Sequence, residues 1–186
     1  RALVVYESMY GNTHAVAVSI AAGLSTRHDV TLVPVTRATP ELVAAADLLV
    51  VGGPTHLHRM STAASRRWAA DAARKQASPL TMDPDADGPG VRGWLEGVRS
   101  VSSLGGQNTL AVAFDTRLGG APLFTGRASR GISRLLARHG CRMLAAPESF
   151  LVSRRDTLRD GEADRARAWG AMIGAAAGDL YAPTVA

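Results

Sequence analysis

Five apolar runs alternate with helix-patterned segments along the whole of this 186-residue chain. The apolar runs, rich in Val, Leu and Ala, cover residues 2–6, 29–35, 47–53, 109–115 and 142–152. The helix-patterned segments cover residues 13–25, 40–46, 61–77, 126–139 and 162–178. Most of the runs are continuous, which is typical of parallel strands covered on both faces. We therefore predict a single α/β domain over residues 1–186, with a doubly wound, five-stranded parallel sheet of order 2-1-3-4-5.

Segment 78–93 interrupts this alternation. It contains three prolines together with several aspartates and glycines, and this composition favours a mobile surface loop inserted into the domain. A calcium loop is not expected, because the glutamate and the spacing of an EF-hand are absent. Trp94, Leu95, Val98 and Val101 then recur at helical spacing and predict a short amphipathic helix before the fourth strand.

Basic residues outnumber acidic residues by 21 to 16, which gives a net charge of +5. Four arginines, Arg127, Arg130, Arg134 and Arg138, lie on one face of the helix predicted over residues 126–139. Such a basic face can bind nucleic acid. No interleaved aromatic residues and no nucleic-acid motif accompany it, so we favour a solvated helix face and do not expect a nucleic-acid partner.

The single cysteine, Cys141, excludes an internal disulfide and a cysteine-based metal cluster. Because an apolar stretch follows it, we expect a buried structural thiol. No apolar run approaches the roughly 20 residues that cross a bilayer, and residues 2–6 are too short for a secretory signal. We therefore expect a cytoplasmic protein without a membrane span.

Residues 8–13, Ser-Met-Tyr-Gly-Asn-Thr, join the first strand to the first helix. Backbone N–H groups at such a turn, with the dipole of the helix, favour a bound anion. Ser8, Thr13 and Asn12 add side-chain donors, and Gly11 allows the backbone to bend. The loop contains no Lys or Arg and lacks the G-x-x-x-x-G-K-[ST] pattern of nucleoside-triphosphate sites. A cradle of neutral donors suits a single phosphate ester.

Two further loops lie where the ligand of an open α/β sheet binds, outside the carboxyl ends of the strands. Residues 52–60 follow the third strand, and residues 115–120 follow the fourth. In two of the three loops the chain resembles the flavodoxin-like family. Ser8–Thr13 matches the phosphate-loop pattern of that family, [TS]-x-[TY]-G-x-T, and Gly53-Pro54-Thr55 matches its Pro-Thr pair after the third strand. The match of residues 115–120 is weaker.

The resemblance implies a flavodoxin-like fold and FMN as the cofactor. It places the cofactor contacts in the three loops, at Ser8, Met9, Tyr10, Gly11, Asn12, Thr13, Pro54, Thr55, His56, Leu57, Arg59, Asp115, Thr116 and Arg117. Asp115 either binds the flavin or caps its own loop. His56 and His58 flank Leu57 and alternate sides if the loop is extended. One of them is either a flavin neighbour or a proton donor to a bound acceptor, and the alternative is that each is an inert loop residue. Without a nearby carboxylate or cysteine they do not indicate a metal site.

Three features depart from the family pattern. Tyr10 replaces a common threonine, and its bulk is expected to shield the phosphate. Residues 54–60 contain no Trp or Tyr to stack on the flavin, so His56, Leu57 or Met60 would pack there. Flavodoxins that shuttle single electrons are typically acidic, whereas this chain is basic. Arg59 or Arg117 beside the flavin would stabilise its two-electron-reduced form, which favours two-electron transfer to a quinone-like acceptor.

The first functional hypothesis is therefore an FMN-dependent redox protein. It is either an electron carrier with a protein partner or an oxidoreductase that reduces a small acceptor, similar to flavodoxin-like NAD(P)H:quinone oxidoreductases. No dinucleotide fingerprint follows a strand, so NAD(P)H would bind only transiently. The alternative hypothesis is a flavin-free binding or regulatory module of the same fold, which the missing aromatic residue favours.

Overall fold

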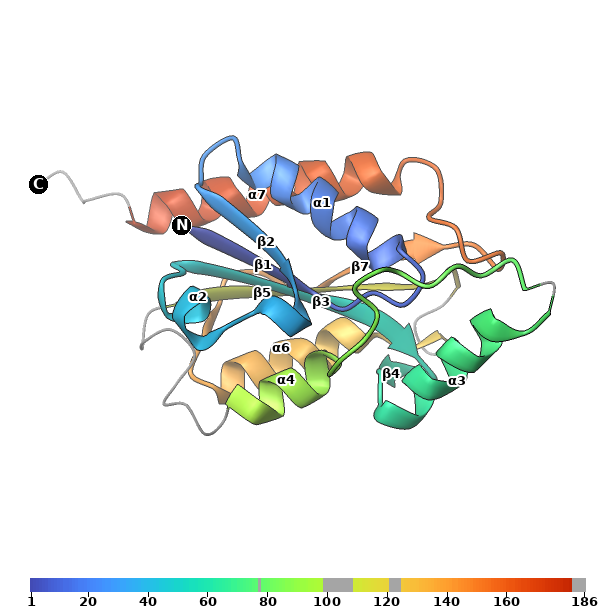
Figure 1. The fold of residues 1–186 in the computed structure, drawn as a ribbon. Coiled ribbons are helices and arrows are strands. Elements are labelled where there is room, and N and C mark those ends of the chain that lie inside the picture. The colour runs from blue at the N-terminus through green and yellow to red at the C-terminus, as the bar shows by residue number, and fades with distance from the viewer. Residues whose placement is uncertain (77, 99–108, 121–124, 182–186) are drawn as a thin grey trace, which may run out of the picture.

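The computed structural model describes residues 1–76, 78–98, 109–120 and 125–181. A central sheet lies between two layers of helices (Figure 1). Its strands are β1 (Ala2–Tyr6), β2 (Val30–Pro34), β3 (Leu48–His56), β4 (Arg59–Met60), β5 (Leu110–Leu118), β6 (Arg142–Met143) and β7 (Glu148–Val152). The main path through the sheet is β2-β1-β3-β5-β6, and β7 also pairs with β5. The flavodoxin-like fold predicted from the sequence is thus confirmed.

The strand count and order differ in part from the prediction. The run 142–152 forms two short strands, because the chain leaves the sheet after Leu144, whose N–H still donates to Ala111, and Pro147 has no N–H to donate to a neighbouring strand. In addition, β4 pairs antiparallel with the end of β3, so the described sheet has seven strands instead of five. Both β3 and β5 also extend three residues past their predicted ends, into polar sequence.

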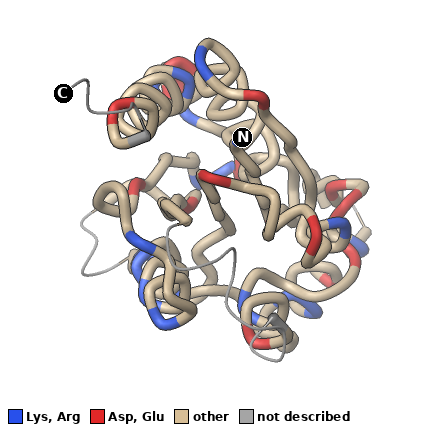
Figure 2. The backbone as a smooth tube through the Cα atoms, turned by 90° about the vertical axis from the view of Figure 1, so that its left-hand side faces the viewer, with Lys and Arg blue, Asp and Glu red and all other residues tan. Residues whose placement is uncertain are grey.

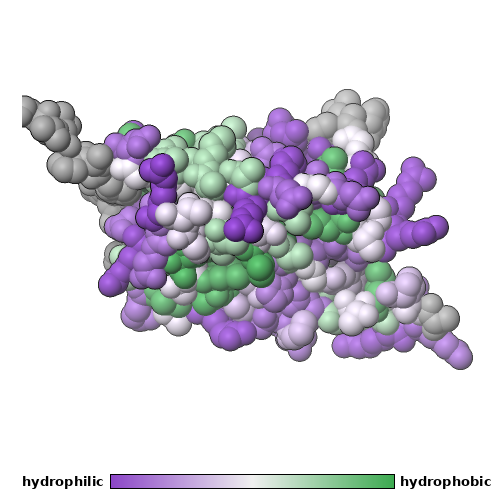
Figure 3. Space-filling view, turned by 90° about the horizontal axis from the view of Figure 1, so that it is seen from above, coloured by the Kyte–Doolittle hydropathy of each residue, from purple (hydrophilic) through white to green (hydrophobic). Residues whose placement is uncertain are grey.

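One face of the sheet carries α1 (Asn12–Leu24) and α7 (Glu162–Tyr181). These two helices approach so closely that a Cβ on Gly170 would lie 2.3 Å from the carbonyl oxygen of Ile20. On the outer surface of this layer, apolar side chains are interspersed with polar ones (Figure 3).

The other face carries α4 (Val91–Val98) and α6 (Ala128–Arg138), with α2 (Pro40–Ala44) and the 3-10 turn Val35–Arg37 nearer the edge. The end-on view shows the helices above and below the strands (Figure 2). Helix α4 is the short amphipathic helix predicted before the fourth strand, although Val101 lies outside the described residues. The predicted helix 61–77 is shorter: α3 spans Ala63–Arg74 and projects beyond the carboxyl ends of the strands (Figure 1).

The sheet separates two apolar cores, as the alternation of side chains along a strand requires. Leu3 and Val5 of β1 enter the core under α4 and α6, whereas Val4 and Tyr6 enter the core under α1 and α7. Cys141 is buried in the first core, as predicted, and burial raises the pKa of its thiol to about 11. Within the described residues, no helix combines the length and the apolar character that a membrane span needs.

Residues 78–90 form no helix or strand, but they are packed against the rest of the domain. Asp83 and Ala86 are buried, and the backbone N–H of Asp83 donates to the carbonyl of Met9 at 2.8 Å. Arg66 of α3 donates to the carbonyls of Ala86 and Gly88. This segment, which we call the strap, therefore connects α3 with the loop that follows β1.

Candidate functional site

The carboxyl ends of β1, β3 and β5 lie side by side where the strand order reverses between β1 and β3. The register places Tyr6 beside Gly52, and Gly53 beside Asp115. A cleft of about 360 Å³ opens at these ends, which is within the usual range for small-molecule sites. The three predicted loops therefore converge on one cleft.

The loop Ser8–Thr13, which we call the cradle, forms the part of the cleft at the N-terminus of α1. Gly11 takes a φ of 90°, a left-handed conformation that favours glycine. Its N–H donates to the Ser8 hydroxyl oxygen at 3.1 Å. Among the described residues, no acceptor pairs with the N–H groups of Asn12, Thr13 and His14 in the first turn of α1. These free donors, aligned with the dipole of a 13-residue helix, form a site for an anion.

Two buried hydroxyl groups extend the donor set of the cradle. Ser8 accepts from Gly11, so its own O–H remains available to a ligand. The hydroxyls of Thr13 and Thr116 lie 2.7 Å apart, which joins the start of α1 to the end of β5. Within the described residues the cradle itself contains no charged side chain, and its donors are neutral.

Tyr10 and Asn12 connect the cradle to its surroundings. The Tyr10 hydroxyl donates to the carbonyl of Ala69 in α3 at 2.8 Å, so it holds α3 as well as bounding the cleft. Burial, and then the nearby charge of Asp156, raises the pKa of Tyr10. The Asn12 amide donates to the carbonyl of Asp156 at 2.9 Å, which ties the cradle to the loop after β7.

The end of β3 supplies Pro54, Thr55 and His56 to the cleft. Thr55 accepts from the N–H of Ala128 at 2.9 Å and thereby fixes the start of α6. The loop is a tight hairpin and not an extended strand, because Leu57 and His58 both have positive φ, at 47° and 71°. The extended loop on which the alternation of His56 and His58 was conditional is therefore not formed.

His56 has a defined hydrogen-bond role. Its Nδ1 lies 3.3 Å from the hydroxyl of Ser65, and that hydroxyl directs its proton to the carbonyl of Thr62 at 3.1 Å. When the hydroxyl donates to Thr62, Nδ1 acts as the donor and the lone pair lies on Nε2. Burial lowers the pKa of His56, and the charge of Arg66 lowers it further while that of Glu7 raises it. Both observations favour the neutral imidazole, with Nε2 as a hydrogen-bond acceptor.

Asp115 and Arg117 of β5 have structural partners. Asp115 is completely buried and accepts from the N–H of Ser129 at 2.7 Å, so it caps the first turn of α6. Burial raises the pKa of its carboxyl, and the neighbouring Ser129 and Ser149 oppose this rise. Arg117 donates through one nitrogen to the carbonyls of Leu118 and Gly120 and to the hydroxyl of Thr125. Its guanidinium therefore organises the loop after β5 while it lines the cleft.

The cleft brings together most of the predicted contacts: Ser8, Met9, Tyr10, Asn12, Thr13, Pro54, Thr55, His56, Thr116 and Arg117. Four predicted residues do not line it. Gly11 shapes the cradle, Asp115 lies beneath it, Leu57 is 68% exposed, and Arg59 lines a different groove.

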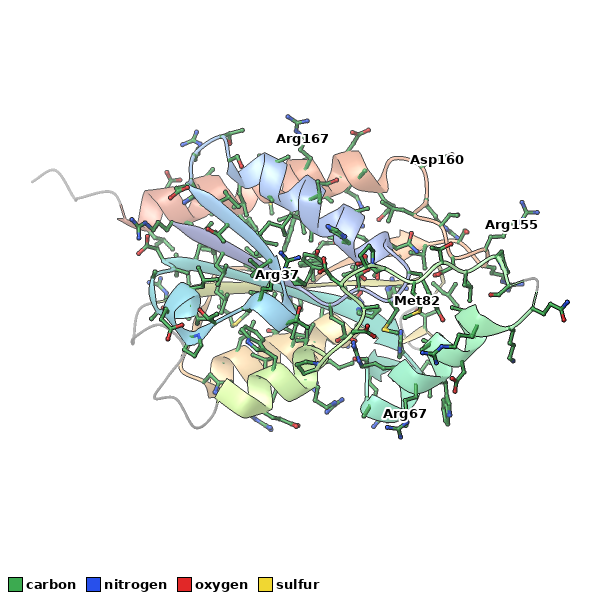
Figure 4. All side chains as sticks on the ribbon, in the orientation of Figure 1. Arg37, Arg67, Met82, Arg155, Asp160 and Arg167 are labelled. Atoms are coloured by element: carbon green, nitrogen blue, oxygen red, sulfur yellow. The ribbon has the colours of Figure 1, made fainter. Side chains whose placement is uncertain are left out.

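Sequence reasoning missed six lining residues: Leu80, Leu118, Val152, Ser153, Arg154 and Asp156. Four of them follow or end β7, the last strand of the sheet. The rule that ligands lie at strand ends, applied to the fifth predicted strand, would have found these four. Leu80 belongs to the strap, where no local pattern indicates a site. Arg155 of the same loop extends outward, away from the cleft (Figure 4).

Comparison with solved structures shows the fold. A flavodoxin from the domain Archaea gives a TM-score of 0.62 at 17% identity, covering 95% of this chain and 98% of that one. Oxidised flavodoxin 1 from Bacillus cereus gives 0.62 at 14% identity, covering 92% and 95%. Rubredoxin oxygen:oxidoreductase from the anaerobe Desulfovibrio gigas gives 0.63 at 16% identity, covering 97% of this chain but only 37% of that one.

Sequence comparison adds the family. No curated protein matches the chain in sequence. A sequence profile described as Flavodoxin, however, matches residues 4–109, which is more than half of the chain and includes the cradle and the end of β3. With this match and the sheet, cradle and cleft described above, the chain belongs to the flavodoxin family, whose members generally bind FMN and carry electrons.

Proposed function

We propose that this chain binds FMN in the cleft, with the phosphate in the cradle, and acts as a redox protein. The observation that carries the proposal is the set of unpaired N–H groups at the start of α1, next to the buried hydroxyls of Ser8 and Thr13. Neutral donors at a helix N-terminus suit one phosphate ester. Family membership supports FMN as the compound that carries this ester.

The rest of the cleft is consistent with a flavin ring. The strand end Pro54–His56 lies on one side and the loop after β7, with Val152 and Ser153, supplies other lining residues. Bound FMN would supply transfer of one or two electrons. The protein would hold the phosphate at the cradle, limit the access of water to the ring, and set the local charge through Arg117 and Arg154.

The finer part of the proposal concerns the acceptor. Arg117 stays a candidate for stabilising negative charge on the reduced cofactor, whereas Arg59 is not in the cleft. Neutral His56 offers Nε2 as a hydrogen-bond acceptor to a ligand beside it. These features favour transfer of two electrons to a quinone-like acceptor. A redox titration should show two closely spaced potentials, and a strongly stabilised one-electron-reduced form would contradict this finer part.

FMN binding is tested by titrating the purified protein with FMN and following the quenching of flavin fluorescence. Wild type should bind, and Thr13→Ala should bind about tenfold more weakly or worse, since a hydrogen bond to a charged group contributes about 1.5–3 kcal/mol. Ser19→Ala is the matched control, because Ser19 lies on the same helix and bonds only to the carbonyl of Ala15. A folded wild-type protein that binds no FMN would favour the flavin-free alternative.

A further inference from the structure

A groove of about 490 Å³ shares the 54–60 loop with the cleft and is lined by arginines. It runs between β4, α6 and the first turn of α4, and no described acidic residue lines it. We call it the basic groove. Its arginines are Arg59, Arg92, Arg127, Arg130, Arg134 and Arg138.

The fold assembles this groove from three separate elements. The sequence shows four of the arginines on the α6 face, and the structure adds Arg59 from β4 and Arg92 from α4. Arg130, Arg134 and Arg138 are exposed on successive turns of α6, which spreads their charge over about 12 Å. In the end-on view, blue segments follow the helix at the lower left, which is α6 (Figure 2).

None of these six arginines forms an ion pair within the described part of the chain. Arg92 donates only to the carbonyls of Met60 and Ser61, and Nε of Arg127 is buried without a partner. In contrast, Arg66 and Arg165 are neutralised by carboxylates. Uncompensated charge of one sign on one face produces a field that attracts an anionic surface.

The position of the groove favours a redox partner over a nucleic acid. The loop that gives His56 to the cleft gives His58 and Arg59 to the groove, and a β-bridge joins His58 to Gly126 at the start of α6. A protein seated on the groove would thus lie at the rim of the cleft, and electron transfer falls steeply with distance. Single-stranded nucleic acid needs aromatic platforms for its bases, and among the residues that the structure describes, no Phe, Tyr or Trp lines the groove.

We propose that the basic groove docks the acidic surface of a redox protein that exchanges electrons with the cofactor in the adjacent cleft. The electron-transfer part rests on the FMN binding proposed above, whereas docking itself does not. Opposite charges accelerate the encounter and fix its orientation, and salt weakens both effects. With a reduced [2Fe–2S] partner, two partner molecules are oxidised for each FMN fully reduced, and one proton from solvent completes the anionic hydroquinone whose charge Arg117 would stabilise.

The test uses an acidic plant-type ferredoxin as the probe. Its binding to the FMN-free and the FMN-loaded protein is measured by calorimetry at 20 and 200 mM salt. The groove variant is Arg130→Glu/Arg134→Glu. The control is Arg27→Glu/Arg167→Glu, at exposed positions on the opposite helical layer, where Arg167 points away from the sheet (Figure 4). Each substitution removes two units of charge, so both double variants change the net charge from +5 to +1.

We expect wild type to bind about tenfold more weakly at 200 mM than at 20 mM salt. At low salt the groove variant should lose about tenfold in affinity, and the control should stay within about threefold of wild type. Equal losses in the two variants, or tighter binding of a single-stranded RNA probe than of ferredoxin, overturn the proposal. Because docking is measured without flavin as well, a protein that binds ferredoxin but no FMN would refute the proposed function alone.

Discussion

The cradle and the basic groove both present positive potential to an anion, but different groups generate it. In the cradle the donors are backbone N–H groups and buried hydroxyls, and no charged side chain takes part. In the groove the potential comes from six arginine side chains, none of them ion-paired within the described residues. The positions of the donors in the cradle are fixed by the backbone, whereas the charges of the groove lie at the ends of long, flexible side chains.

This difference separates two kinds of recognition. Fixed backbone donors lose little entropy on binding and match the geometry of one small group, so they suit a resident phosphate. Arginines spread along a helix act over a distance set by the Debye length and suit a broad, transient partner. Positive potential can therefore serve specificity in the cradle, where neutral donors produce it, and encounter in the groove, where charged side chains produce it.

The largest expected effect distinguishes a structural arginine from those of the groove. Arg66 pairs with buried Glu7 at 2.6 Å and also binds two carbonyls of the strap. Arg66→Ala leaves the Glu7 carboxylate buried without its cation, and should lower the free energy of unfolding by about 3–5 kcal/mol. Arg134→Ala should change the free energy of unfolding, measured by urea denaturation, by less than about 0.5 kcal/mol. Equal losses of unfolding free energy in the two variants would mean that the groove arginines also support the fold.

A smaller effect is expected when the cradle is altered and the groove is left intact. Gly11→Val places a β-branched residue at a φ of 90°, a strain of about 1–3 kcal/mol that reshapes the cradle. FMN affinity should fall by about 5- to 150-fold in a fluorescence titration. Ferredoxin binding to the groove should remain within about twofold of wild type. A parallel loss of both affinities would show that the two surfaces are not independent.

The smallest effect concerns charge inside the cleft. Because burial lowers the pKa of His56 below its ordinary value of 6.5, the unfolded chain takes up a proton before the folded chain does. Relative to His56→Gln, wild type should therefore lose stability as the pH falls below about 6.5, with a slope of at most about 1.4 kcal/mol per pH unit, and level off below the folded pKa. Urea denaturation of both proteins at pH 7.5 and 5.5 measures this. A wild type that gains stability on acidification would contradict a neutral His56.

Much of the fold could be predicted because its signals are local. Continuous apolar runs located the strands, and the repeat of Val16, Ile20 and Leu24 located α1, all of which are buried. The cradle could also be predicted from the sequence, because all the donors that face one small anion lie within a single short motif. Arg127, Arg130, Arg134 and Arg138 were visible as a helical face for the same reason.

The remainder depends on contacts between distant residues. The hydroxyl of Tyr10 binds Ala69, 59 residues away, and nothing near Tyr10 indicates that partner. Arg59 and Arg92 join the α6 face only because β4 and α4 pack beside it. The sequence allows two roles for Asp115, flavin contact or loop cap, and the cap it provides to Ser129 depends on where α6 begins. The split of the last strand likewise follows from where β6 and β7 pair with distant β5, which hydropathy does not encode.

The hydrogen bond from Tyr10 to Ala69 has a thermodynamic consequence. Ser65 is the one residue of α3 that is buried, so little apolar packing holds this helix in place. Its attachment depends on Tyr10, on Arg66 and on the strap, and the strap in turn bonds to Met9 of the cradle. A ligand that binds only the ordered cradle would therefore also stabilise α3 against local unfolding, because ligand binding and local stability are thermodynamically linked. We therefore expect a ligand in the cradle to reduce the fraying of α3, and fraying of α3 to weaken ligand binding.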